Sequence, residues 1–357
     1  MFEIYERADY KKIIAWVLQN WDKLNLPKTN QQTLKFNILP FRKAGLHSLL
    51  NFIVFSEEKP LIVLKMPRYK DGKLAFKAIE DEAKNLEFIS AQGLLKENLP
   101  LIYKLVKIDN TPVIIMKAYE GKMLHQLLDQ EESPAEIENL LKLGAAPLLS
   151  LNAPQEKTLA TLKPSYITNQ LKTVVQLYPD LLKKLETSLT DFFKERPLVE
   201  LRYPQVFIHQ EYNPWNLLCE QDNNLIILDW EDALRKSFPL LDMFNYFTVA
   251  FRILVVGETP SAKNRKPEQK QERGLQLINY YNQFQKEYCL KLNISQELVD
   301  FFFIVFCLNS TLFFIGDKRK EISYGRNWLL PLTNLAPKNC FESYLKQQLQ
   351  SAGGQKG

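Results

Sequence analysis

The sequence predicts an α+β fold in two unequal parts, a small mixed part followed by a larger and mostly helical part. Short apolar runs rich in β-branched and aromatic residues, which are typical of strands, are concentrated before residue 120. From Gly121 onward, apolar residues recur mainly at helical spacing over long stretches. The length of 357 residues suits two domains or one two-part unit, at about 150 residues per domain.

The first part predicts a helix, several strands and a second helix. Residues 1–30 predict a helical extension, because Ile13, Ile14, Val17 and Leu18 recur at helical spacing. A further helix is expected over 75–94, and Gly93 lies where a helix C-cap is expected. Strands are expected over 34–39, 49–55, 61–66, 101–106 and 113–118.

The second part predicts long helices with two short strands among them. Helices are expected over 136–151, 164–178 and 181–195, and short strands over 206–208 and 225–228. The stretch 262–273 has no apolar residue after Ala262, so it predicts an exposed loop or insert. The tail at 351–357 is expected to fray.

Composition excludes several classes of protein. Hydrophobic residues make up 46% of the chain and charged residues 24%, values that do not fit a disordered, collagen-like or coiled-coil chain. The cysteines show no metal-ligand spacing, which argues against a zinc site or a disulfide framework and predicts indifferent thiols in a reducing compartment. They are Cys219, Cys289, Cys307 and Cys340.

Charge and hydropathy indicate which kind of ligand the protein binds and in which compartment it is expected. Residues 1–118 carry 19 Lys and Arg against 13 Asp and Glu, a mild excess that suits a small anionic ligand better than a nucleic acid. The first residues lack a basic segment followed by an apolar run, so we expect no secretory signal. The most apolar stretch, 301–315, is short against the roughly 20 residues of a membrane span. This stretch is therefore expected to be a buried core helix, and we expect a cytoplasmic protein with no membrane span and no nucleic-acid partner.

The chemistry-bearing residues cluster within 206–231, where two strand-like runs flank a polar loop. Asn216 and Asp229 offer hard oxygen ligands, which suit Mg²⁺ bound together with substrate phosphates. Glu211 lies five residues before Asn216 and could act as a base toward an incoming hydroxyl. These roles are the ones that phosphoryl transfer requires, since positioning, metal and charge neutralisation dominate that reaction.

The spacing His-x-Glu-x-x-x-x-Asn, from His209 to Asn216, followed by Asp-Trp-Glu at 229–231, resembles the aminoglycoside phosphotransferase and choline kinase family. That family has a protein-kinase-like fold and carries His-Gly-Asp-x-x-x-x-Asn and then Asp-x-Glu. The Asn-Pro-Trp-Asn run at 213–216 is similar to the Ala-Pro-Trp-Asn of an uncharacterised subset. The resemblance implies that Asn216 and Asp229 bind metal, His209 orients the loop backbone, and Asp242 braces the loop from the following helix.

The resemblance also implies a bilobal molecule, with a small antiparallel-sheet N-lobe containing one helix and a larger, mainly helical C-lobe. Its parts would be a helical extension at 1–33, a nucleotide-binding N-lobe at 34–120, a C-lobe with the catalytic loop and acceptor site at 121–350, and a flexible tail at 351–357. Lys65, at the end of an apolar strand, would hold nucleotide phosphates, and Glu82 would pair with it from the next helix. The hinge backbone around Ala118 and Glu120 would meet the adenine ring.

Two positions depart from the family pattern. The chain has no Gly-x-Gly-x-x-Gly; the candidate phosphate loop at 40–48 has one glycine, and Arg42 and Lys43 could cover the phosphates or belong to a solvated turn. Glu211 stands where the family has its catalytic aspartate. The extra methylene displaces the carboxylate by roughly one bond length, a scale of misplacement that can cost ~10²-fold in rate.

Two functions follow from this pattern. The first is an ATP- and Mg²⁺-dependent phosphotransferase that moves the γ-phosphoryl group to a hydroxyl of a small metabolite, such as a sugar, an amino alcohol or a glycan precursor. The alternative is a pseudokinase, a nucleotide-binding or regulatory module in which Glu211 has ended catalysis. The presence of Lys65, Glu82, Asn216 and Asp229 favours the enzyme, because a module without metal chemistry has less need of the metal ligands.

Overall fold

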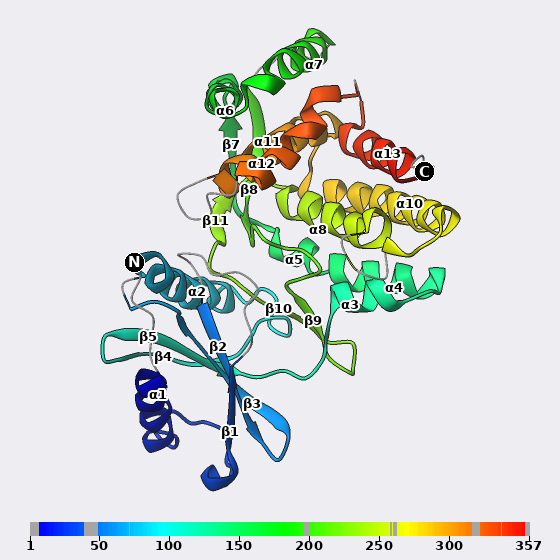
Figure 1. Ribbon diagram of the computed structural model, residues 1–357. Coiled ribbons are helices and arrows are strands. Elements are labelled where there is room, and N and C mark those ends of the chain that lie inside the picture. The colour runs from blue at the N-terminus through cyan, green and yellow to red at the C-terminus, as the bar shows by residue number, and fades with distance from the viewer. Residues whose placement is uncertain are drawn as a thin grey trace. The chain divides into compact units, whose positions relative to one another are not determined.

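The computed structural model describes residues 7–38, 49–70, 72–195, 200–257, 259, 263–315, 322–336 and 338–353. The chain forms two compact units (Figure 1). Unit 1 consists of Met1–Gly121 and Cys219–Ala233, and unit 2 of Lys122–Leu218 and Leu234–Gly357. The first change of unit, after Gly121, falls where the sequence changes from strand-like runs to helical spacing. The segment Cys219–Ala233, expected within the second part, groups instead with the first.

Unit 1 is built on an antiparallel sheet of five strands in the order β1-β2-β3-β5-β4. This sheet, together with the helices of unit 2, confirms the expected α+β class. Its elements are α1 (Arg7–Gln19), a 3₁₀ turn (Gln31–Thr33), β1 (Lys35–Ile38), β2 (Leu49–Ser56), β3 (Lys59–Pro67), α2 (Lys73–Ala91), β4 (Ile102–Ile108), β5 (Thr111–Lys117) and β10 (Leu225–Ile227). Each expected strand of the first part is present with its bounds moved by a few residues.

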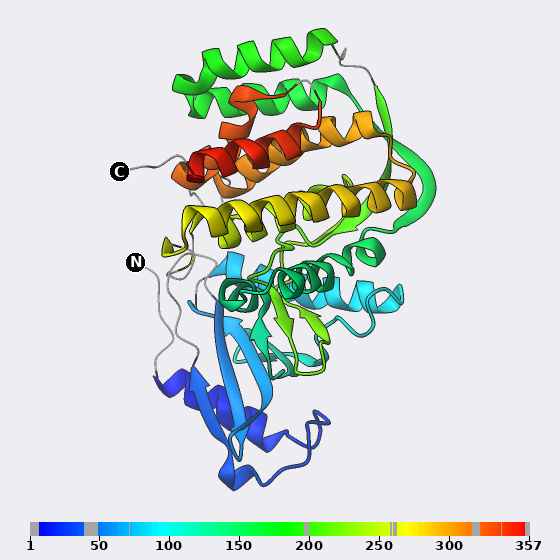
Figure 2. The same cartoon turned by 90° about the vertical axis from the view of Figure 1, so that its right-hand side faces the viewer.

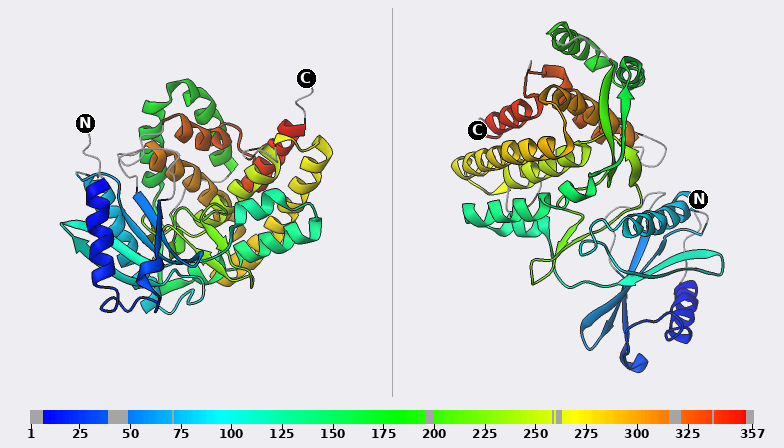
Figure 3. Two further views of the ribbon diagram at one scale, coloured as in Figure 1. Left: turned by 60° about the horizontal axis from the view of Figure 1, so that its bottom comes forward. Right: turned by 180° about the vertical axis from the view of Figure 1, so that it is seen from behind.

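The two faces of this sheet are covered by different helices. Alternate residues of a strand point to opposite faces, and the residues around Phe52 and Leu64 pack with Val17 and Trp21, from α1 and the turn that follows it. The opposite face packs against α2, through Ile79 and its neighbours. Figure 3 shows α1, in dark blue, lying against the sheet. The N-terminal helix is therefore part of the hydrophobic core of unit 1.

This packing predicts that α1 contributes to stability. Val17 is fully buried and Ala15, two residues earlier on the same helix, is exposed. Val17→Asp would bury an unpaired carboxylate and is expected to destabilise the protein by about 3 kcal/mol or more. Ala15→Asp, which adds the same charge in water, is the matched control. Urea unfolding of the full chain measures both, and equal midpoints for the two variants would contradict this role of α1.

Two glycines mark where unit 1 changes direction. Helix α2 ends at Ala91, two residues before Gly93, whose φ of +69° lies in the left-handed region that glycine adopts without strain. At Gly121, a Cβ atom would lie 2.1 Å from the carbonyl oxygen of Cys219. Only glycine lets the two backbones approach so closely, which keeps the end of the connector against the returning segment.

Unit 2 is mostly helical, with a second antiparallel sheet in the order β11-β8-β7. Figure 2 shows α10, in yellow, and α13, in red, lying side by side. Its elements are β6 (Lys122–Met123), α3 (Leu124–Gln130), α4 (Pro134–Ala145), α5 (Leu148–Leu151), β7 (Pro154–Leu162), α6 (Pro164–Leu177), η2 (Pro179–Leu181), α7 (Leu182–Glu195), β8 (Leu201–Ile208), β9 (Leu217–Cys219, which ends in unit 1), β11 (Leu234–Ser237), α8 (Leu241–Phe251), a π-helix (Arg252–Val256), α10 (Pro267–Leu292), α11 (Gln296–Ile315), α12 (Ile322–Leu329), η4 (Leu330–Asn334) and α13 (Cys340–Gly353).

Aromatic residues form the centre of unit 2. Phe244 of α8 packs against Phe303 of α11 and Phe341 of α13, with ring centroids 5.5 and 5.0 Å away. Among the described residues, α11 is the one helix long and apolar enough to cross a membrane by length and composition. Two thirds of its apolar window is buried inside the protein. Burial to this extent is typical of a core helix inside a folded unit.

Three sequence expectations for unit 2 differ from the structure. The single helix expected over 136–151 is two, α4 and α5, and the break falls at Ala146 and Pro147. Strands β7, β9 and β11 were not expected, because they are short or carry few alternating apolar residues. The expectation of an exposed loop or insert over 262–273 is wrong for the residues from Arg265 onward. Arg265 donates to the carbonyls of Ile253 and Leu254, and α10 begins at Pro267.

Candidate active site

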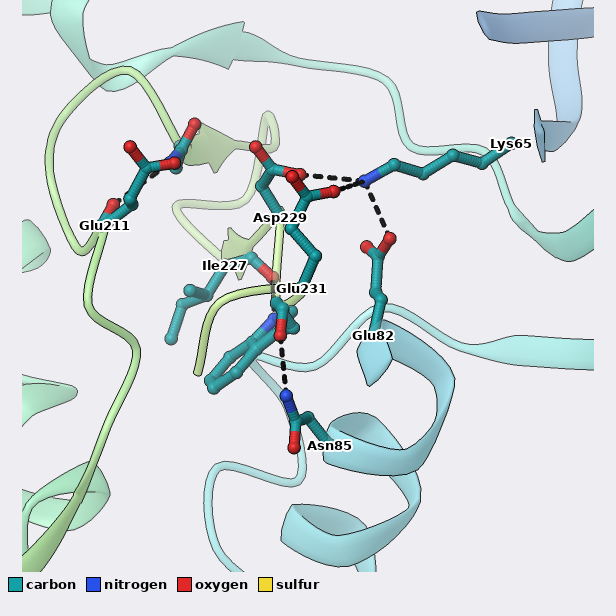
Figure 4. A network of polar contacts seen from close by, with 9 residues as sticks. Lys65, Glu82, Asn85, Glu211, Ile227, Asp229 and Glu231 are labelled. Atoms are coloured by element: carbon teal, nitrogen blue, oxygen red, sulfur yellow. Dashed lines mark hydrogen bonds and ion pairs between the residues drawn. The ribbon is translucent and has the colours of Figure 1, made fainter. Parts of the chain in front are cut away.

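The site residues of unit 1 surround one lysine. The Lys65 ammonium lies 2.7 Å from Glu82 Oε2, 2.8 Å from Asp229 Oδ1 and 3.8 Å from Glu231 Oε2. Figure 4 shows these side chains converging on the lysine. The structure thus brings together Lys65, Glu82 and Asp229, three of the residues that the sequence singled out.

Each member of this cluster is placed by a different element. Lys65 lies on β3, which is bordered on both sides by strands, and pairs with Asn51 of β2 and Ile114 of β5. Glu82 lies on the face of α2 that packs against the sheet. Asp229 follows β10 and has a φ of +69°, a left-handed conformation that aspartate tolerates better than most residues. The turn after β10 and one face of α2 therefore converge on β3.

The turn that carries Asp229 is fixed by contacts that the sequence did not reveal. The Trp230 indole is fully buried and donates through Nε1 to the carbonyl of Ile227 at 2.6 Å. The Asn85 carboxamide donates to the carbonyls of Trp230 and Ala233, at 3.0 and 3.3 Å. Asn85 lies three residues after Glu82, so one face of α2 positions both the lysine partner and the Asp-Trp-Glu turn. That i, i+3 spacing is the one signal in the sequence that could have indicated Asn85.

The electrostatics of the cluster favour a charged lysine and a surplus of negative charge. Burial alone would lower the pKa of Lys65, but the surrounding carboxylates, that of Asp229 most, outweigh it and raise this pKa well above its usual value. Burial raises the pKa of Glu82, although the charge of Lys65 opposes this shift. Burial also raises the pKa of Glu231, and the negative charge of Asp229 raises it further. One ammonium facing three carboxyl groups leaves room for a further cation or a proton.

The carboxylates of this cluster have the chemistry of a metal site. One oxygen from each of Glu82, Asp229 and Glu231 lies within 4.8 Å of the others. Oxygen donors of this kind suit a hard divalent cation. Asp229, whose side chain is 36% exposed, is the most accessible member, whereas Glu82 is 2% exposed and committed to Lys65. A cation at Asp229 would compete with Lys65 for the same oxygen.

The site residues of unit 2 lie on the loop between β8 and β9. The Asp242 carboxylate, at the start of α8, accepts the backbone N–H groups of His209 at 2.8 Å and Gln210 at 2.9 Å. Gln210 has a φ of +72°, so a non-glycine residue stands in the left-handed region and Asp242 holds its amide there. Burial raises the pKa of Asp242 to about 6, although the two amides oppose this shift. Asp242 and the His209 backbone thus lie together, as the resemblance implied.

Hydrogen bonds between side chains and backbone within the loop fix the part that carries Glu211 and Asn216. The Glu211 carbonyl accepts the carboxamide Nδ2 groups of Asn213 at 2.9 Å and Asn216 at 3.0 Å. The Asn213 Oδ1 atom in turn accepts the N–H of Trp215 at 3.0 Å. Because Asn216 uses its nitrogen in this bond, its Oδ1 is the atom suited to a metal. Glu211 and Asn216 are therefore linked through main chain in one tight turn.

A stacked aromatic pair adjoins this loop. The imidazole of His125, at the start of α3, lies 3.7 Å from the ring of Trp215, with 26° between the planes. The backbone N–H of His125 also donates to the carbonyl of Pro214 at 3.0 Å. No motif in the sequence indicated His125, since its partner Trp215 lies 90 residues away along the chain. The contact ties the start of unit 2 to the loop between β8 and β9.

The remaining sequence candidates lie at the hinge and in the expected phosphate loop. The Ala118 N–H donates to the carbonyl of Leu61 at 3.0 Å, so an adenine ring would have to use another backbone group of the hinge. Glu120 is exposed. Arg42, Lys43 and the rest of 40–48 lie outside the described residues.

A comparison with models of known protein families shows the family of this chain. A family model described as the phosphotransferase enzyme family (APH) matches residues 48–246, more than half of the chain. The chain therefore belongs to this phosphotransferase family, with the protein-kinase-like fold that its motifs imply. The comparison with curated proteins gives no match.

Solved structures similar to this chain include several aminoglycoside phosphotransferases. APH(2'')-Ib with ADP is 15% identical, with 89% of this chain and 96% of that chain covered and a TM-score of 0.46. The ternary complex of APH(2'')-IIa with streptomycin and ATP is 15% identical, with 90% and 98% covered and a TM-score of 0.47. APH(3'')-Id from Streptomyces rimosus is 12% identical, with 79% and 97% covered and a TM-score of 0.45.

Proposed function

We propose that this protein is an ATP- and Mg²⁺-dependent phosphotransferase that moves the γ-phosphoryl group to a hydroxyl of a small metabolite. The observation that supports it most is the cluster of unit 1, in which a buried lysine is held by Glu82 and Asp229. Membership of the phosphotransferase family supports the same reaction class. The cluster supplies what phosphoryl transfer needs most, fixed positive charge and oxygen ligands for a cation.

In this proposal the lysine changes partners when nucleotide binds. Lys65 is charged and lies 2.8 Å from Asp229. Nucleotide phosphates attract the ammonium, and Glu82 keeps it in place while Asp229 is released for the cation. Asp229 and Asn216 would hold Mg²⁺, which when bound neutralises charge on the phosphate oxygens. The lysine then stabilises charge on the phosphates by the same Coulomb attraction that now binds it to Asp229.

Glu211 is proposed as the base that accepts the proton of the acceptor hydroxyl. Its backbone is fixed by the bonds from Asn213 and Asn216, and the preceding amides are held by Asp242. A glutamate has an intrinsic pKa close to that of aspartate, so it can take over the proton at neutral pH. The acceptors we favour are sugars, amino alcohols and glycan precursors, each of which offers a hydroxyl nucleophile.

The second candidate function is a pseudokinase that binds nucleotide without transferring phosphate, and Glu211 is the residue that raises it. Substitution of this residue separates the two functions. In an active enzyme, Glu211→Gln removes the base and is expected to lower kcat by about 10²-fold or more. Glu211→Asp keeps a base and is expected to retain more activity than Glu211→Gln. The measurement is steady-state transfer from Mg·ATP to an acceptor.

Glu186→Gln, a substitution of the same chemistry at an exposed position on α7, is the matched control and should leave kcat unchanged. The pseudokinase would differ from the active enzyme in the comparison of wild type with Glu211→Asp. Its wild type would bind nucleotide in a thermal-shift assay without transferring phosphate to any hydroxyl acceptor, and Glu211→Asp would gain transfer. An active wild type that Glu211→Gln leaves unaffected would contradict the role of Glu211 as the base.

A further inference from the structure

We propose that Asn152 and Tyr288 are positioning residues, which hold the loop carrying Glu211 in place through Asp242. This inference rests on the proposed function, because it assigns these residues to the same loop. Neither residue belongs to the sequence motif, and both are fully buried, at 1% and 0% exposed. Together with Asp242 they form a continuous polar chain from α10 to the loop (α8 and α10 are labelled in Figure 1).

Asn152 connects the end of β8 to Asp242. Its Nδ2 donates to the carbonyl of Phe207 at 2.7 Å and to Asp242 Oδ2 at 3.4 Å. The same Oδ2 accepts the N–H of His209 at 2.8 Å. Asn152 thus fixes both the last residues of the strand that enters the loop and the carboxylate that holds the first two loop amides.

Tyr288 fixes Asn152 and the start of α8 at the same time. Its hydroxyl donates to Asn152 Oδ1 at 2.9 Å and accepts the N–H of Leu240 at 3.2 Å. Leu240 has a φ of +72° and immediately precedes α8, two residues before Asp242. The hydroxyl therefore sets the backbone that presents Asp242 as well as its side-chain partner.

The direction of these bonds gives Tyr288 a role beyond filling space. A carboxamide has one donor end and one acceptor end, and the O–H of Tyr288 occupies the acceptor end of Asn152. The donor end must then face Phe207 and Asp242. Without the hydroxyl, the carboxamide loses the contact that selects this orientation, and the reversed one would place two oxygens against each other. Gln210, whose φ is strained, depends on Asp242 and is the residue most sensitive to that change.

The substitution Tyr288→Phe tests this inference, with Tyr281→Phe as its matched control. Both tyrosines lie on α10 and both are buried, at 0% and 1% exposed, so each substitution removes one buried hydroxyl. Tyr281 lies outside the polar chain described above. Amide hydrogen exchange over 206–212 is expected to become roughly 5- to 10-fold faster in Tyr288→Phe, the loss of about one hydrogen bond. It should remain at the wild-type rate in Tyr281→Phe.

Kinetics provide the second readout. Tyr288→Phe is expected to lower kcat by roughly 5- to 10-fold while the KM for ATP changes less than about twofold, because the loop and not the nucleotide site is disturbed. Asn152→Asp, which sets a second carboxylate against Asp242, is expected to increase exchange further. Equal exchange over 206–212 in the two tyrosine variants would overturn the inference. A wild type that transfers no phosphate would instead refute the proposed function. The exchange result would then still decide whether Asn152 and Tyr288 position the loop.

Discussion

Lys65→Met is expected to lower phosphoryl transfer by about 10³-fold, because it removes the ammonium that the carboxylates of Glu82, Asp229 and Glu231 surround. Methionine preserves the length and apolar stem of the side chain, so the substitution deletes little but the charge. The ammonium is the group proposed to stabilise the nucleotide phosphates. Steady-state transfer from Mg·ATP measures the effect.

The same substitution has an expected effect on stability. Removing one partner of a buried ion pair leaves a buried charge, which typically costs about 3–5 kcal/mol. Glu82 already has a raised pKa from burial, opposed by Lys65, and this pKa should rise further without the lysine. A carboxyl group with a raised pKa in the folded state binds more protons there than in the unfolded chain, so its stability contribution decreases as the pH rises. The variant should therefore lose more stability at pH 8 than at pH 5.

Lys107→Met is the control for Lys65→Met. Lys107 lies on β4 of the same sheet, but its side chain is 65% exposed and pairs with the carboxylate of Glu80 near the surface. Surface pairs of this kind contribute little, so both activity and the urea midpoint should stay close to wild type. Similar losses in the two variants would show that the cluster around Lys65 has no special role.

Asp229→Asn is expected to abolish Mg·ATP turnover, with a loss of about 10³-fold or more, while the fold remains intact. The fold should survive because the Asp229 side chain is 36% exposed and Lys65 keeps Glu82 as its partner. The amide has one oxygen and no negative charge, so it is a poor ligand for a hard cation. Turnover and the Mg²⁺-dependent part of the nucleotide thermal shift should disappear together.

Asp222→Asn is the control for Asp229→Asn. Asp222 lies between β9 and β10, a few residues before the cluster, and accepts the backbone N–H of Asn224 at an exposed position. Its substitution removes one carboxylate from the same segment and should leave both readouts unchanged. Unchanged turnover in Asp229→Asn would refute the assignment of this residue to the metal.

The sequence predicts those parts of the site that depend on order along the chain. Strand, lysine and helix follow one another in unit 1 in the order that the family resemblance implies, so the resemblance was enough to expect the Lys65–Glu82 pair that the structure shows at 2.7 Å. The loop from His209 to Asn216 has a fixed length between β8 and β9, so its candidate residues could be predicted from their motif in the same way.

The supporting contacts were not predictable, because they join positions far apart in sequence that have no distinctive residue type. Tyr288 and Asn152 are 136 residues apart, and Asn85 and Trp230 are 145 apart. A buried tyrosine or asparagine looks like any other in a helical pattern until its partner is known. The packing of α1 was hidden for a related reason, since helical spacing shows an apolar face but not what covers it.

The proposed transfer of the γ-phosphoryl group of ATP can be measured by ³¹P NMR of wild type with Mg·ATP and a panel of sugars, amino alcohols and glycan precursors. The proposal predicts that one class of acceptor produces a new phosphomonoester resonance while the γ-phosphate signal decreases, and that Asp229→Asn produces neither change. Nucleotide binding by thermal shift, with no phosphomonoester formed from any acceptor, would contradict the claim and favour the pseudokinase.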